Sequence, residues 1–238
     1  MNTQLRCIVF DMDDTLYLER DYVRSGFLHA GALVEKELGG RGFYDAAWEL
    51  FLEGQRGDIF NRALKRIGLP APASVIQGLV DAYRNHIPAI SLAEDAVQCL
   101  DGLHSEYHLA LITDGPVVSQ ENKARALQLD RWMDLNIFTD RWGASYYKPH
   151  PLAFLTVQER TGASPNECMY VADNPKKDFT APTQLGWVTV RIRRDGGLHS
   201  HTISHECEPN HELKDLSALI QIVNGNSSFC GDFIVQGD

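Results

Sequence analysis

The sequence predicts an α/β fold in which helices flank a parallel sheet and further helices are inserted after the first strand. Two observations support this prediction. Between residues 92 and 224, short apolar runs alternate with stretches of helical spacing, which is typical of a parallel sheet covered on both faces. Between residues 18 and 91, four stretches have helical spacing and none resembles a strand, so this segment is predicted to form a separate helical bundle.

The predicted strands are short apolar runs that stop at polar residues, and they cover residues 5–10, 108–115, 135–140, 168–173 and 187–193. The core helices are predicted over residues 92–106, 117–129, 151–162, 176–186 and 213–223. The inserted helices, most of them closed by Gly or Pro, are predicted over residues 20–40, 42–54, 58–70 and 72–87. The chain thus divides into a Rossmann-like core, an insert and a C-terminal tail that is expected to be mobile, over residues 1–17 with 92–224, 18–91 and 225–238.

Charge, hydropathy and cysteine content limit the class of function. The formal net charge is -10 and the pI is about 5.3, which argues against a nucleic-acid-binding surface. No apolar run reaches the length of about 18 residues that a membrane span needs, and the first residues lack a signal-peptide pattern, so a cytoplasmic protein is expected. The 5 cysteines form no CxxC pair, and neither a disulfide nor a cysteine-bound metal is expected.

An acidic cluster follows the first predicted strand. Asp11, Asp13, Asp14 and Thr15 are crowded together in "FDMDDTLY". Carboxylates tolerate such proximity when a divalent cation lies between them, and Mg²⁺ prefers oxygen ligands. Because the carboxyl ends of parallel strands meet at one edge of a sheet, Asp173 is expected to complete a metal site from another strand. One carboxylate could then attack phosphorus, and a second could protonate the leaving oxygen and later activate water.

Four motifs, in order, resemble those of the haloacid dehalogenase (HAD) superfamily. "FDMDDTLY" resembles its first motif, Asp-x-Asp-x-Thr after a buried strand, and "LITDG" resembles the second, a Thr or Ser that ends a strand. Lys148 in "YYKPHP" resembles the third, a lysine just before a helix. "YVADNPKKDF" resembles the fourth, an acidic pair with Asp-x-x-x-x-Asp spacing. The motifs span residues 10–178, most of the core, and the resemblance implies that the insert is a cap over the site.

The resemblance implies a role for each matching acidic residue. Asp11 would attack phosphorus and also bind Mg²⁺. Asp13 would be the general acid and base, with its backbone carbonyl on the metal. Asp173 would bind the metal directly or through water, and Asp178 would orient that shell. Catalysis would then consist of positioning and charge neutralisation.

The resemblance also implies residues that hold the phosphoryl group. Thr113 and the backbone amide of Asp114 would bind it, with Gly115 beside them in the same motif. Lys148 would neutralise Asp11 and the phosphate. Thr15, in the first motif, would support its loop by hydrogen bonding.

Two positions depart from the family pattern. The second motif more often has Asn where this chain has Asp114, and another anion near a phosphate is unfavourable unless its side chain points away or contacts a substrate hydroxyl. The fourth motif usually opens with Gly-Asp, whereas this chain has Ala172-Asp173, a small change of little expected consequence. Asp13 discriminates within the superfamily, because a halide leaving group needs no proton whereas an alkoxide does. The presence of Asp13 therefore favours phosphate ester chemistry over dehalogenation.

Simpler explanations exist for each residue taken alone. An Asp after a strand can cap a helix, and Asp14 is expected to be only a turn or cap residue. A lone Lys148 can be a solvated surface lysine, and Asp178 can pair only with Lys176 or Lys177. The ordered set of motifs is what favours the catalytic interpretation.

Two further groups of residues invite a binding role. A zinc site in the His-rich loop 199–211 is conceivable, but scattered loop histidines are more often solvated; the residues are His199, His201, His205, Cys207 and His211. Cations of the insert are candidates for binding an anionic leaving group: Arg20, Arg24, Arg56, Arg62 and Lys65.

The function predicted from the sequence is that of a Mg²⁺-dependent phosphatase acting on a small soluble phosphate monoester. A phosphotransferase or mutase with the same Asp11 nucleophile is the first alternative, in which a sugar hydroxyl would accept the phosphoryl group. A non-catalytic binding protein on the same fold is the second. The sequence leaves the substrate open, because the insert determines the substrate and the sequence does not show which of its residues face the site. The oligomeric state is also left open.

Overall fold

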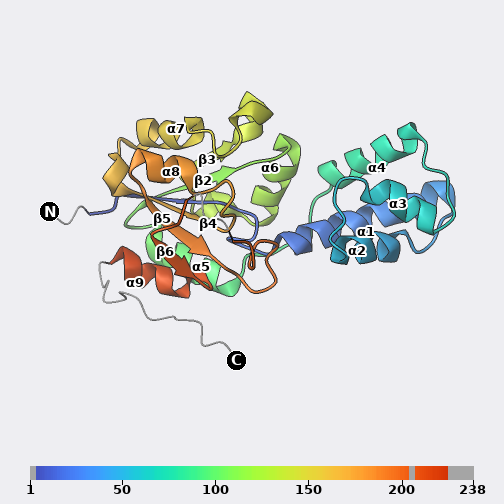
Figure 1. Ribbon diagram of the computed structural model, residues 1–238, viewed down its shortest axis with the longest axis horizontal. Coiled ribbons are helices and arrows are strands. Elements are labelled where there is room, and N and C mark those ends of the chain that lie inside the picture. Colours follow the sequence, from blue (N-terminus) through green and yellow to red (C-terminus); the bar gives the residue numbers. More distant parts are fainter. Residues whose placement is uncertain (1–3, 204–206, 225–238) are drawn as a thin grey trace.

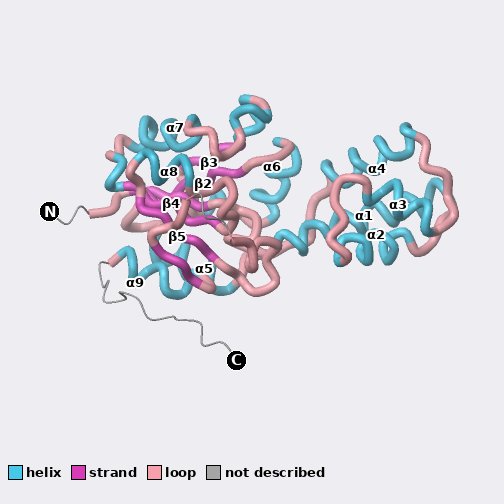
Figure 2. The backbone as a smooth tube through the Cα atoms, in the orientation of Figure 1, coloured by secondary structure: helices cyan, strands magenta, loops and turns pink. Residues whose placement is uncertain are grey.

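The computed structural model describes residues 4–203 and 207–224, and within them the strands form one parallel sheet (Figures 1 and 2). Its strand order is β3-β2-β1-β4-β5-β6. The strands are β1 (Cys7–Phe10), β2 (His108–Thr113), β3 (Leu135–Phe138), β4 (Cys168–Ala172), β5 (Val188–Ile192) and β6 (His211–Leu213). The first five lie inside the predicted strands. β1 lies between β2 and β4, so the chain order reverses on either side of it.

Helices cover both faces of the sheet, because alternate strand residues point to opposite sides. Val9 packs in one apolar cluster with residues of α7 (Leu152–Thr161) and α8 (Thr180–Leu185). Phe10 packs in the other with residues of α5 (Glu94–Leu103) and α9 (Leu219–Val223). A further core helix, α6 (Val117–Ala126), follows β2. The Rossmann-like class predicted from the sequence is confirmed.

Between β1 and α5 the structure has four helices and no strand of the sheet, as predicted. These are α1 (Glu19–Leu38), α2 (Phe43–Leu52), α3 (Ile59–Arg66) and α4 (Ala73–Asn85), and we call these four helices the insert. The insert has an apolar core of its own, in which Phe43 and Phe51 are buried and Tyr44 and Trp48 are partly buried. It stands to one side of the sheet (Figure 1).

The C-terminal end of α4 is tied to the core by side chains of α6. The Ser119 hydroxyl donates to the carbonyl of Arg84 at 3.1 Å. The Asn122 amide donates to the carbonyls of Asn85 and His86, each at 3.2 Å. The end of α4 therefore has a fixed position next to the sheet edge.

Two predicted helices are shorter than expected. The helix predicted over 176–186 begins only at Thr180, because Asp178 closes a turn in which the amide of Asn174 donates to its carboxylate at 2.9 Å. The helix predicted over 213–223 is helical only in its second half. Leu213 is the last residue of β6, and a 3₁₀ turn at Leu216–Ala218 then precedes α9. The predicted tail, 225–238, lies outside the described residues. No helix of the described chain is long and apolar enough to cross a membrane.

Candidate active site

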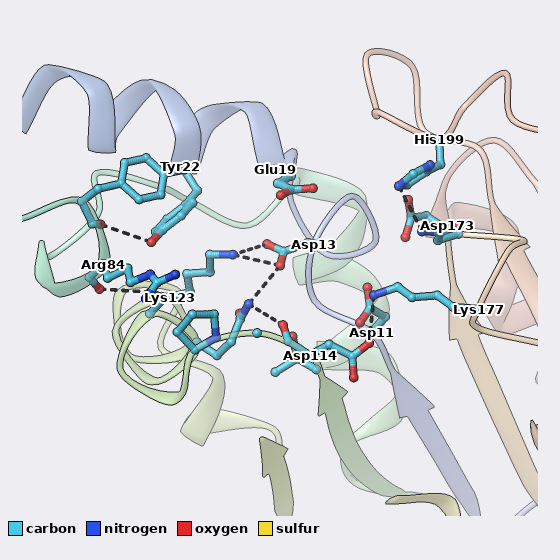
Figure 3. Close-up of a pocket in the computed structure, with 17 residues that line it drawn as sticks. Asp11, Asp13, Glu19, Tyr22, Arg84, Asp114, Lys123, Asp173, Lys177 and His199 are labelled. Carbon is cyan, nitrogen blue, oxygen red and sulfur yellow. Dashed lines mark hydrogen bonds and ion pairs between the residues drawn. The ribbon is translucent and has the colours of Figure 1, made fainter. Parts of the chain in front are cut away.

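Three neighbouring strands bring the predicted site residues to one edge of the sheet. Asp11 directly follows β1, Thr113 ends β2, and Asp173 directly follows β4. These residues line a cavity of about 340 Å³. Figure 3 shows the carboxylates of Asp11 and Asp173 on one side of this cavity and residues of the insert on the other.

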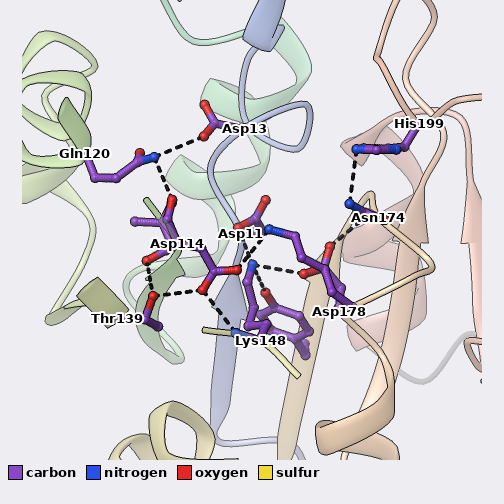
Figure 4. A network of polar contacts seen from close by, with 12 residues as sticks. Asp11, Asp13, Asp114, Gln120, Thr139, Lys148, Asn174, Asp178 and His199 are labelled. Atoms are coloured by element: carbon purple, nitrogen blue, oxygen red, sulfur yellow. Dashed lines mark hydrogen bonds and ion pairs between the residues drawn. The ribbon is translucent and has the colours of Figure 1, made fainter. Parts of the chain in front are cut away.

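Lys148 links the carboxylates below the cavity. Its ammonium lies 2.6 Å from Asp11 Oδ1 and 2.9 Å from Asp178 Oδ1, and it donates to the Tyr170 hydroxyl at 2.9 Å (Figure 4). The Lys148 side chain is fully buried. Burial alone would lower its pKa, but the two carboxylates raise the pKa well above its ordinary value, so Lys148 stays charged. Asp178 thus pairs with Lys148, so the simpler explanation that it pairs only with Lys176 or Lys177 is wrong.

Asp11, Asp173 and Asp178 form a buried carboxylate cluster. One oxygen from each lies within 4.8 Å of the others, and among the described residues this is the one such group of potential metal ligands. Burial, opposed by Lys148, raises the pKa of Asp11 to about 6, and burial together with the Asp178 charge raises that of Asp173 well above its ordinary value. Lys148 contacts only two of these three carboxylates, so negative charge remains in the cluster, which fits a hard divalent cation.

Asp13 lies outside this cluster and has its own partners. Both of its carboxylate oxygens accept from Lys123, at 2.8 and 2.9 Å, and Oδ1 also accepts from the Tyr17 hydroxyl. The Gln120 amide lies 3.4 Å from Oδ2. Burial acts to raise the pKa of Asp13, but Lys123 and Tyr17 outweigh it and hold the pKa below the ordinary value. Sequence reasoning missed Lys123 and Gln120, although their spacing of three places both on one face of α6.

The charge of Asp114 is paired with Lys177 and its carboxylate has further partners, which answers the question raised by its departure from the family pattern. Oδ1 accepts from the Thr139 hydroxyl at 2.8 Å and from the Lys148 amide at 3.2 Å. Oδ2 lies 2.9 Å from the Lys177 ammonium (Figure 4). The lysines outweigh burial and lower the pKa of Asp114. Gly115, at a φ of 115°, shapes the turn that follows.

Two residues of the first motif stabilise their loop in ways that differ from one another. Asp14 adopts a left-handed φ of 53° and accepts from the amides of Glu19, at 2.8 Å, and Leu198, at 2.7 Å, so the expected turn and cap role is confirmed. The hydroxyl of Thr15 was expected to hydrogen-bond within the loop, and this is wrong. That hydroxyl is buried without a partner among the described residues, and the carbonyl of Thr15 instead accepts from Arg194 at 2.8 Å.

The wall of the cavity contains residues that sequence reasoning did not single out. Side chains of the insert reach the cavity, among them Tyr22, Tyr83 and Arg84. Glu19 also lines the cavity, and burial raises the pKa of its carboxyl group to about 7. None of the five cations proposed from the sequence lines this cavity. Arg84 gave no signal in the sequence because it sits at the end of a helix whose direction depends on tertiary packing.

His199 is the member of the His-rich loop that reaches the cavity. Its Nε2 lies 3.0 Å from the Asn174 amide nitrogen, beside the carboxylate cluster. The described histidines and cysteines of the loop form no metal-binding group, and His205 lies outside the described residues. The described cysteines, Cys7, Cys99, Cys168 and Cys207, are free thiols.

Comparisons with known proteins agree with this fold. The family model described as haloacid dehalogenase-like hydrolase matches residues 5–186. A glyceraldehyde 3-phosphate phosphatase of Methanopyrus kandleri is 26% identical over 231 residues, which cover 92% of this chain and 97% of the relative. An (S)-2-haloacid dehalogenase of Burkholderia cepacia is 29% identical over 152 residues, 63% of either chain.

Solved structures share the fold. The HAD-hydrolase YfnB from Bacillus subtilis, bound to magnesium, superposes with a TM-score of 0.68 at 20% identity, over 93% of this chain and 100% of that one. The family model covers most of the core, so the chain belongs to the haloacid dehalogenase-like hydrolases. Its relatives include both phosphatases and dehalogenases.

Proposed function

We propose that the protein is a Mg²⁺-dependent phosphatase that hydrolyses a small phosphate monoester through an aspartyl-phosphate on Asp11. The observation that carries the proposal is the position of Asp13, an acid two residues after Asp11 that lines the same cavity and is held by Lys123 and Tyr17. A phosphate ester needs such a group because its leaving alkoxide must be protonated, whereas a halide leaves without a proton.

In the proposed reaction, a carboxylate oxygen of Asp11 attacks phosphorus and the bond to the ester oxygen breaks. Asp13 gives its proton to that oxygen. As a carboxylate, Asp13 then takes a proton from water, which attacks the aspartyl-phosphate and releases inorganic phosphate. Lys148, 2.6 Å from Asp11, balances the charge of the nucleophile and of the transferred group. Thr113 and the backbone at Asp114 and Gly115 line the cavity where that group would lie.

The carboxylate cluster supports the choice of cofactor. Asp11, Asp173 and the backbone carbonyl of Asp13 would hold Mg²⁺, and Asp178, anchored to Lys148, would orient the other ligands. The cation would neutralise negative charge on the phosphate group of the substrate.

The helices of the insert support a cap role, and we propose that the chain divides into core and cap near residues 17 and 92. Tyr83 and Arg84 at the end of α4 line the cavity together with the core residues. A cap of this kind excludes water from the first step and contacts the leaving group. The cavity of about 340 Å³ suits a small metabolite.

Relatives named glyceraldehyde 3-phosphate phosphatase support a phosphatase over a dehalogenase, since they match nearly the whole chain. The phosphotransferase alternative shares every residue above and differs only in the acceptor. The non-catalytic alternative leaves the pairing of Asp11 with Lys148 and of Asp13 with Lys123 without a purpose.

The test is release of inorganic phosphate from a panel of metabolite phosphates, with and without Mg²⁺, for the native protein and for Asp11→Asn. We expect release that needs both Mg²⁺ and Asp11. Chloride release from 2-chloropropionate, measured in parallel, identifies a dehalogenase. Phosphate that appears on an added sugar or polyol, instead of in solution, identifies a transferase. A folded protein that binds Mg²⁺ and turns over none of these compounds would refute the proposal.

A further inference from the structure

At the insert end of the cavity, one cation has no acidic partner within residues 4–203 and 207–224. Lys123 pairs with Asp13, and Lys177 pairs with Asp114. Arg84 also lines the cavity, and within the described part of the chain its guanidinium makes neither an ion pair nor a hydrogen bond. In Figure 3 its side chain extends toward Lys123, along the wall that faces Asp13.

The backbone of Arg84 is held in place even though its side chain is free. Its carbonyl accepts from the buried Ser119 of α6, and the carbonyl of the next residue, Asn85, accepts from Asn122. These hydrogen bonds therefore fix the backbone position of Arg84 and leave its guanidinium exposed at the cavity. A hydrogen-bond partner for the guanidinium has to come from a molecule in the cavity or from solvent.

The surroundings of Arg84 would otherwise repel an anion. Asp13 and Glu19 both line this part of the cavity, and Lys123 is already neutralised by Asp13. An uncharged leaving group has no need of a further cation there. A guanidinium with five donors suits a planar carboxylate, which it can bind through two parallel hydrogen bonds.

We propose that Arg84 is a specificity-determining residue that binds a carboxylate on the leaving group. The substrate class is then a phosphorylated hydroxy acid, in which the phosphate lies at Asp11 and the carboxylate lies at the end of α4. This inference rests on the proposed phosphatase function and narrows it. It differs from the aldehyde named for the relatives, whose leaving group is uncharged.

The decisive comparison uses 3-phosphoglycerate and glyceraldehyde 3-phosphate, which share the carbon skeleton and the phosphate position and differ in carboxylate against aldehyde. We expect the native protein to prefer the carboxylate in kcat/KM by about 10-fold or more. Arg84→Gln should lose this preference, mainly through a higher KM for 3-phosphoglycerate, and should keep kcat/KM for the aldehyde within about 3-fold. Arg84→Lys should restore part of the preference.

Arg24→Gln is the matched control, because it removes the same charge from an exposed position on α1 outside the cavity. It should leave both substrates unaffected. A native protein with no preference for the carboxylate, or an Arg84→Gln variant that loses both substrates equally, would overturn the inference. Either result would leave the phosphatase function standing.

Binding measurements separate the inference from turnover. By calorimetry, Asp11→Asn should bind 3-phosphoglycerate about 10-fold more tightly than Asp11→Asn with Arg84→Gln. Equal affinities would overturn the role of Arg84 even if no compound in the panel is hydrolysed. The absence of turnover would then count separately, against the proposed function.

Discussion

Lys123 Nζ lies 2.8 and 2.9 Å from the two carboxylate oxygens of Asp13, although the residues are 110 positions apart in the chain. Both side chains are largely shielded from water. The pair fixes the orientation of Asp13 and favours its carboxylate form, which takes a proton from water in the second step of the proposed reaction. Lys123 is therefore a positioning residue for Asp13.

Replacing Lys123 tests this role. Lys123→Met should lower kcat for an alkyl phosphate by about 10- to 100-fold, because the acid loses its position. The pKa of Asp13 should rise, since burial would no longer be opposed by Lys123, so the limb of the kcat–pH profile that reports Asp13 should move to higher pH. Lys123→Arg should retain more activity than Lys123→Met. An unchanged pH profile and kcat in Lys123→Met would exclude the role.

The ion pair of Asp114 with Lys177 gives a prediction about stability. Asp114→Asn removes the ion pair with Lys177 and places an amide beside its ammonium. We expect a loss of about 1–2 kcal/mol in the free energy of unfolding, moderated because Lys177 is 35% exposed. Adding Lys177→Met should recover part of the loss. Urea denaturation measures both variants, and equal stability of Asp114→Asn and native protein would contradict the structural role.

The carboxylate cluster predicts a pH-dependent response to Mg²⁺. The pKa of Asp11 is 3.8 in its ordinary state and about 6 when folded, so between these values the folded protein holds more protons than the unfolded chain. The stability of the metal-free protein should therefore fall as the pH rises from about 4 to about 7.

Mg²⁺ should replace the protons, so its addition should raise the Tm by several degrees at pH 7 and by less at pH 5. Scanning calorimetry with and without a chelator measures this difference. Ca²⁺ in place of Mg²⁺ shows whether the smaller ion is preferred. A Tm rise of the same size at both pH values would argue against proton replacement in the cluster.

Two glycines of α1 provide a matched pair of substitutions. A Cβ on Gly26 would lie 2.4 Å from the ring of Tyr83, whereas the nearest atom to a Cβ on Gly31 is 3.4 Å away. Gly26→Ala should destabilise the protein by about 1–3 kcal/mol and, by displacing Tyr83 at the cavity, raise KM. Gly31→Ala should stabilise it by up to about 1 kcal/mol through helix propensity. Equal effects of the two in urea denaturation would contradict the close α1–α4 contact.

The sequence predicts the parts of the molecule that depend on local pattern. Five strands were located because their apolar runs are short and end at polar residues, and the sheet edge then places Asp11 next to Asp173. β6 was missed, because its three residues alternate in no apolar pattern and are strand only through pairing with β5. Lys123 and Arg84 were missed because their place at the site depends on helix packing across the chain.

The carboxylate of Asp14 connects two segments that are far apart in the chain. It receives the first amide of α1, at Glu19, and the amide of Leu198, next to His199 at the cavity. Because one carboxylate holds both amides, a tilt of α1 that brings the insert toward the sheet would also displace the residues 194–199. Movement of the insert over the cavity and movement of His199, which lies beside Asn174, would then be coupled through Asp14.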